Sequence, residues 1–149
     1  MSTNKQSFKT LNLIYFALIM GQTLFALVVF FIKGEIAIED LSPFNMIVPI
    51  LSMSTIGLSY FLYNKMKASG QKLEGVHAKF NHYRTSNIVR FAMLEGGNLF
   101  AIVIVLLTGS TFFYLFFGLG MIAFLMARPS EEGFINDYNV SRGKLAELE

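Results

Sequence analysis

The sequence predicts an all-α integral membrane protein, built as a four-helix bundle. Three observations support this fold class: the apolar composition, four apolar runs of roughly membrane-spanning length, and an asymmetric distribution of positive charge. Of the 149 residues, 54% are hydrophobic and only 15% are charged, whereas a soluble domain carries about 25% charged residues. Most of this apolar surface must therefore face lipid. The chain has no cysteine, which excludes disulfide frameworks, thiolate metal sites and cysteine-linked lipid anchors.

Each of the four apolar runs has a length suited to crossing a hydrocarbon core about 30 Å thick as an α-helix. The predicted spans cover residues 11–32, 44–63, 88–107 and 112–127. In lipid each span has to be helical, because no water is available to satisfy the backbone N–H and C=O groups. The first run is longer than a signal-peptide core and no small-residue cleavage site follows it, so we interpret it as a retained span.

The positively charged residues lie almost entirely on one side of the predicted membrane. Eleven of the 12 Lys and Arg residues fall in the N-terminal segment, in the long loop 64–87 and the start of the next span, or in the tail 128–149. Only Lys33 lies on the opposite side, in a loop that also carries acidic residues. Because cytoplasmic loops hold the excess of Lys and Arg, both termini are predicted to be cytoplasmic.

Two segments of the sequence resemble each other. Residues 15–34 and 90–109 align at a constant offset of 75, with eight identities in twenty positions. This predicts an internal duplication of two helical hairpins in parallel topology, although apolar segments with few residue types also align by chance. Each copy places two small residues four apart on one helix face, which would let the first and third spans pack closely as a central pair. These residues are Ala17, Gly21, Ala92 and Gly96.

Glu95 is the only carboxylate deep inside a predicted span, about 10 Å from its cytoplasmic boundary. A charged residue there costs about 2.5–3.5 kcal/mol on insertion scales, and such residues usually face a bundle interior or a water-filled cavity. Asn98 lies on the same helix face at i+3, and Gln22 and Thr23 occupy the matching depth in the first copy. The four are predicted to form a buried polar cluster, either an ion or proton site or a contact between helices.

Basic residues are concentrated in and beside the loop 64–87, where they are predicted to bind anionic lipid headgroups. These residues are Lys65, Lys67, Lys72, Lys79, Arg84 and Arg90. Apolar residues recur at helical spacing over 73–83, which predicts that the third helix begins before its span. His77 and His82 do not share a helix face and no cysteine or carboxylate cluster accompanies them, so no metal site is predicted.

The tail 128–149 is too short to form a domain of its own. Ser130 is a suitable N-cap for a short helix whose first turn is acidic. Phe134, Ile135 and Tyr138 would dock this helix either on the basic loop or on another protein.

The segment 88–109 contains an Arg-Phe-Ala-x-x-Glu-Gly core and is followed by a further apolar run and then by Arg128-Pro129-Ser130. In these features the chain resembles uncharacterised small bacterial inner-membrane proteins of four helices. The resemblance covers most of the chain and implies a four-helix fold in a bacterial inner membrane, but it implies no activity, cofactor or site residue.

The sequence contains no Gly-rich phosphate loop, no Ser/His/Asp arrangement and no paired catalytic carboxylates. Its net charge of +2 is not the basic excess of a nucleic-acid-binding protein. We therefore expect a non-enzymatic membrane scaffold or accessory subunit without a cofactor, whose partners are lipids and other membrane subunits or further copies of this chain. The alternative is a small oligomeric transport protein, or a proton- or cation-conducting protein, with Glu95 as the titrating group.

Overall fold

The computed structural model describes residues 3–33 and 40–148, and this part of the chain consists of helices and the segments that connect them, without a strand. The five α-helices are α1 (Thr3–Ile32), α2 (Phe44–Gly70), α3 (Val76–Thr108), α4 (Tyr114–Met126) and α5 (Glu131–Tyr138). Two short 3-10 helices are η1 (Thr111–Phe113) and η2 (Arg142–Leu148). The predicted all-α class is confirmed for the described residues.

Three helices, α1, α2 and α3, are long and apolar enough to cross a membrane. This agrees with the prediction of a membrane protein. The fourth predicted span corresponds to η1 and α4, which meet the same criterion only together with α5, at a bend of 76°. With 13 residues, α4 is about 20 Å long, which is shorter than a hydrocarbon core of about 30 Å. The count of four spans and their orientation therefore stay predictions. In the acidic loop after the first span, Glu35 and Glu39 lie outside the described residues.

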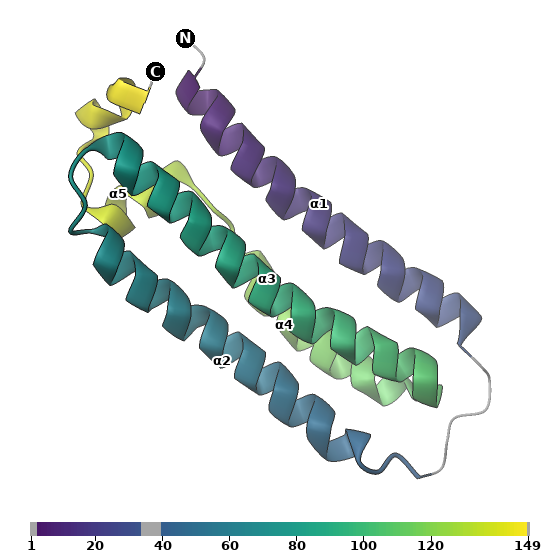
Figure 1. Cartoon of the computed structure of the whole chain (residues 1–149). Coiled ribbons are helices and arrows are strands. Elements are labelled where there is room, and N and C mark those ends of the chain that lie inside the picture. Colours follow the sequence, from purple (N-terminus) through teal and green to yellow (C-terminus); the bar gives the residue numbers. More distant parts are fainter. Residues whose placement is uncertain (1–2, 34–39, 149) are drawn as a thin grey trace.

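The helix α3 occupies the centre of the molecule. Figure 1 shows α1 and α2 on either side of α3, with α4 behind it. The contact of α3 with α2 is the most extensive, followed by those with α4 and α1. The expectation that α1 and α3 form the central pair is thus wrong, because α3 alone is central and packs mainly on α2. The helices α1 and α3 run in the same direction (Figure 1), and the internal duplication stays a prediction.

Both termini and the turn between α2 and α3 lie at one end of the molecule, which we call the terminal end (Figure 1). Most of the predicted loop 64–87 is helical, since α2 continues to Gly70 and α3 begins at Val76. Gly75, just before α3, has a φ of 82°, which glycine adopts without the steric cost of a Cβ. The predicted early start of the third helix is therefore confirmed, and α3 begins about 18 Å before Ile88, where its span was predicted to start.

The apolar core consists of two clusters separated by a polar layer. The cluster near the terminal end is rich in aromatic residues and includes Tyr15, Tyr83, Phe91, Phe124, Phe134 and Tyr138. The cluster at the opposite end is mostly aliphatic and includes Ala26, Val29, Val48, Ile102, Val105 and Phe113. Gln22 and Asn98 are buried between the two clusters along α1 and α3. This layer is the first candidate for a functional site.

Candidate functional site

Two of the four residues of the predicted polar cluster meet in the structure. The side-chain Nδ2 of Asn98 on α3 donates a hydrogen bond of 2.6 Å to Oε1 of Gln22 on α1. The exposed fractions of Gln22 and Asn98 are 1% and 2%. The Nε2 group of Gln22 is buried and has no hydrogen-bond partner among the described residues. This arrangement ties α1 to α3 in an apolar surrounding, which is the structural role considered for the cluster.

Two glycines allow neighbouring helices to approach α3 at the depth of the polar layer. A Cβ atom at Gly120 of α4 would overlap Oδ1 of Asn98. A Cβ atom at Gly97 of α3 would overlap Oγ1 of Thr55 on α2. The sequence analysis missed both glycines, because it placed Glu95 inward and Gly97 lies about 200° of helix rotation from Glu95.

The small residues that were predicted to pack α1 against α3 lie elsewhere. Ala17 and Gly21 of α1 and Ala92 and Gly96 of α3 are all exposed. A Cβ atom added at Gly21 or Gly96 would have no neighbour within 4 Å. The prediction is therefore wrong for this contact. The reason is the rotation of the helix. α1 turns Gln22 toward α3, and Gly21, its neighbour in the sequence, points about 100° away.

Thr23 does not join the polar cluster. It is exposed and lines a groove of about 380 Å³ between α1 and α4. The other residues of this groove are Ala26, Leu27, Phe30, Tyr114 and Phe117. The groove is thus almost entirely apolar, and Thr23 provides no polar partner for Asn98.

Glu95 lies at the edge of the surface that α3 turns away from its neighbours. Its side chain is half-buried, and no hydrogen bond or ion pair joins its carboxylate to another described residue. Ala92, Gly96 and Val103 are exposed on the same side of the helix. We call these four residues the outer face of α3. The expected convergence of Glu95 with Gln22 and Asn98 is not observed, because Glu95 lies at the edge of the buried side of α3, about 60° of helix rotation from Asn98, and bonds neither residue.

Arg90 was predicted to reach lipid headgroups, but it is buried between α2 and α3 with an exposed fraction of 8%. Its guanidinium carbon lies 4.1 Å from the ring centroid of Tyr60 and 4.8 Å from that of Tyr63. A cation stacked on aromatic rings is stabilised by the ring quadrupole, and most strongly where water is excluded. The prediction is wrong because this face of α3 packs on α2 and does not turn to the surface.

Two more of the predicted headgroup-binding residues hold the tail. Lys67 pairs with Oδ1 of Asp137 at 3.2 Å, and Lys79 donates to the carbonyl oxygen of Tyr138 at 3.0 Å. The hydroxyl of Tyr63 donates to Oδ2 of Asp137 at 2.6 Å. The remaining three, Lys65, Lys72 and Arg84, are exposed, and their binding to headgroups stays a prediction.

The tail helix α5 docks on the chain itself, at the terminal end. Ser130 caps it, as predicted, by accepting a hydrogen bond of 3.0 Å from the N–H of Gly133. Phe134 and Tyr138 are fully buried in the aromatic cluster. The tail was predicted to dock either on the basic loop or on another protein. In the structure it docks on the residues of the basic loop, which form the adjoining ends of α2 and α3.

The buried hydroxyl of Tyr138 completes this contact. It lies 2.9 Å from Nδ1 of His82 and 3.1 Å from Oγ of Ser86. Burial raises the pKa of Tyr138 above its ordinary value, so the hydroxyl is neutral and can donate one hydrogen bond and accept another. No group of three His, Cys, Asp or Glu residues within 3–33 and 40–148 is placed to hold a metal ion.

Similarity to other proteins adds nothing to these contacts. The resemblance to small four-helix inner-membrane proteins stays a prediction. Comparison of the chain with protein-family models, with curated proteins and with solved structures finds no match.

Proposed function

We propose that the protein is a non-enzymatic scaffold or accessory subunit of a bacterial inner-membrane complex, with four spans and both termini in the cytoplasm. In this proposal the outer face of α3 binds a helix of another membrane subunit. The observation that carries it is the half-buried carboxylate of Glu95, which has no partner among the described residues and lies in the middle of a helix long enough to cross a membrane.

A carboxylate in this position is costly in lipid. Insertion scales assign about 2.5–3.5 kcal/mol to a charged residue near the centre of a span, and such residues normally pair with another group. Two nearby polar groups of the described chain do not pair with it, since Asn98 bonds Gln22 and Arg90 stacks on tyrosines. A hydrogen-bond donor or a cation on a partner helix would offset this cost.

The residues beside Glu95 suit the close approach of such a helix. Ala92 and Gly96 are exposed and small, and no side chain covers Gly96. Small residues four apart allow two helix backbones to approach each other in a membrane. Inside the molecule, Gly97 and Gly120 already serve in this way. The outer face therefore combines the two features of a membrane helix contact, a polar group and a small-residue surface.

A photo-crosslinking amino acid placed at Ala92 tests this proposal in the native membrane. The matched control is the same amino acid at Ile122, which is exposed on α4. We expect a defined protein adduct from position 92, either with another subunit or with a second copy of the chain, and none from position 122. A Glu95→Leu change should reduce the adduct at 92. Equal adducts from both positions, or adducts with lipid alone, would contradict the proposal.

A second candidate function uses the same carboxylate as an ion site. An unpaired Glu95 could take up a proton or a cation where several copies enclose it, which makes the protein a small oligomeric conducting unit. Proton and cation flux into liposomes that contain the purified protein tests this candidate. It requires flux that Glu95→Gln abolishes, whereas the absence of flux, or flux that survives this change, removes it.

A further inference from the structure

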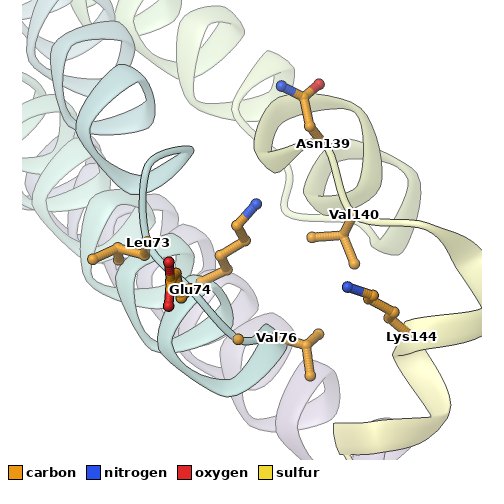
Figure 2. Close-up of a pocket in the computed structure, with 8 residues that line it drawn as sticks. Leu73, Glu74, Val76, Asn139, Val140 and Lys144 are labelled. Carbon is orange, nitrogen blue, oxygen red and sulfur yellow. The ribbon is translucent and has the colours of Figure 1, made fainter.

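A cavity of about 290 Å³ lies at the terminal end, between the α2–α3 turn and the tail. Figure 2 shows the turn and the first residues of α3 on one side and the segment that follows α5 on the other. The labelled lining residues are Leu73, Glu74, Val76, Asn139, Val140 and Lys144. The cavity therefore joins two segments that are at least sixty residues apart in the sequence.

Two ammonium groups from these separate segments line the cavity, Lys79 from α3 and Lys144 from η2. Lys79 donates one hydrogen bond of 3.0 Å, to the carbonyl oxygen of Tyr138, and an ammonium group has three donors. The side chain of Lys144 is directed away from the tail and toward the turn (Figure 2). Glu74 is the acidic residue of the lining, so the two lysines and this carboxylate leave one net positive charge.

We infer that this cavity binds the phosphate group of a small soluble molecule. A phosphate monoester has three acceptor oxygens and a charge of about −1.5 to −2 near neutral pH, so one group can bond both ammonium groups although Glu74 offsets part of their charge. Lysine binds phosphate as a point charge and needs no fixed bidentate geometry. The volume is close to the lower limit of about 300 Å³ for ligand pockets, so the ligand is small.

The position of the cavity favours a soluble ligand over a lipid headgroup. Val76 precedes Ile88, where the span is predicted to begin, by a distance of about 18 Å along α3, and Lys79 precedes it by about 13 Å. The headgroup layer is only about 5–8 Å thick on each side of the hydrocarbon core. A tilt of about 20° shortens these distances by less than a tenth. In the proposed topology the cavity thus opens beyond the headgroups, in the cytoplasm.

A bound phosphate would also strengthen the attachment of the tail. It would bridge Lys79 on α3 and Lys144 on the tail, and it would neutralise the repulsion between the two ammonium groups. The choice of a soluble ligand rests on the proposed topology, whereas phosphate binding itself does not depend on the scaffold proposal, because the cavity shares no residue with the outer face of α3.

Inorganic phosphate is the probe for a direct test. The full-length protein, in neutral detergent, is titrated with radiolabelled phosphate in equilibrium dialysis, with chloride held constant. Lys144→Gln is the diagnostic variant, because this exposed side chain can change without removing the Lys79–Tyr138 hydrogen bond. Lys72→Gln is the matched control, since Lys72 is exposed in the α2–α3 turn beside the cavity and does not line it.

We expect one saturable phosphate site per chain, at least tenfold weaker in Lys144→Gln and unchanged in Lys72→Gln. Phosphate should also slow proteolytic removal of the tail in the unaltered protein. The absence of saturable binding, or an equal loss in both variants, overturns the inference. A second arm uses nanodiscs of phosphatidylcholine with or without phosphatidylglycerol. If the anionic lipid displaces phosphate in a manner that depends on Lys144, the source is a headgroup and the soluble ligand is ruled out.

Discussion

The two sides of α3 differ sharply at one depth in the molecule. On the inner side Asn98 is buried and bonded to Gln22, whereas three residues earlier Glu95 is half-buried and has no partner among the described residues. The same contrast holds for adjacent glycines, since Gly97 lies against Thr55 and nothing covers Gly96. Within the chain, polar and small residues on the inner side stabilise the fold, and the same residue types on the outer side are left available for another molecule.

The largest effect should come from filling the inner glycine of α4. Gly120→Val would place its side chain against Asn98. Asn98 is buried and bonded to Gln22, so it could move away only by losing this hydrogen bond. We expect a loss of about 1–3 kcal/mol in the free energy of unfolding, measured by titration with a denaturing detergent. Gly96→Val is the matched change on the outer side and should leave stability unchanged. Equal losses would remove the distinction between the two sides.

Breaking the polar pair should have a smaller effect. Asn98→Ala leaves the buried amide of Gln22 without its partner, and we expect a loss of about 0.6–1.7 kcal/mol in the same unfolding measurement. A double-mutant cycle with Gln22→Ala should show coupling between the two positions. Thr23→Val serves as the control, because Thr23 lies in the apolar groove. If the two single effects simply add, the hydrogen bond does not stabilise the molecule.

The stacked arginine extends the comparison toward the terminal end. Arg90→Lys keeps the charge but loses the planar group that lies over Tyr60 and Tyr63. The expected loss in the free energy of unfolding is about 0.5–1 kcal/mol. Arg84→Lys, an exposed position on the same helix, should have no measurable effect. A neutral Arg90→Lys change would indicate that the planar guanidinium group does not contribute to the α2–α3 contact.

The smallest effect on stability should come from the outer side itself. Glu95→Gln removes a charge that pairs with no described residue, so the unfolding free energy of the isolated chain should change by less than about 0.5 kcal/mol. The same variant, examined in the native membrane, should alter the crosslink from position 92 if a partner cation binds the carboxylate. A large loss of stability in the isolated chain would instead mean that Glu95 has a structural role within it.

The helices themselves could be predicted because the signals for them are local. Apolar runs of sufficient length predicted α1, α2 and α3. Helical spacing over 73–83 predicted the early start of α3, and Ser130 predicted the N-cap of α5. Such features depend on a few neighbouring residues. The fourth span was less well determined, because α4 is short and the apolar run alone does not reveal the bend before α5.

The sequence by itself therefore determined that this chain is helical, apolar and suited to a membrane, and it identified Gln22 and Asn98 as residues that belong together. Only the tertiary structure decided which face each helix turns inward, and it placed Gly97 and Gly120, which were not predicted, at the close contacts of α3 with α2 and α4. It also placed Arg90 on two tyrosines and the tail on the α2–α3 extension. The rotation of a helix about its axis depends on all of its neighbours at once, and in a chain with apolar residues on every side no local pattern specifies it.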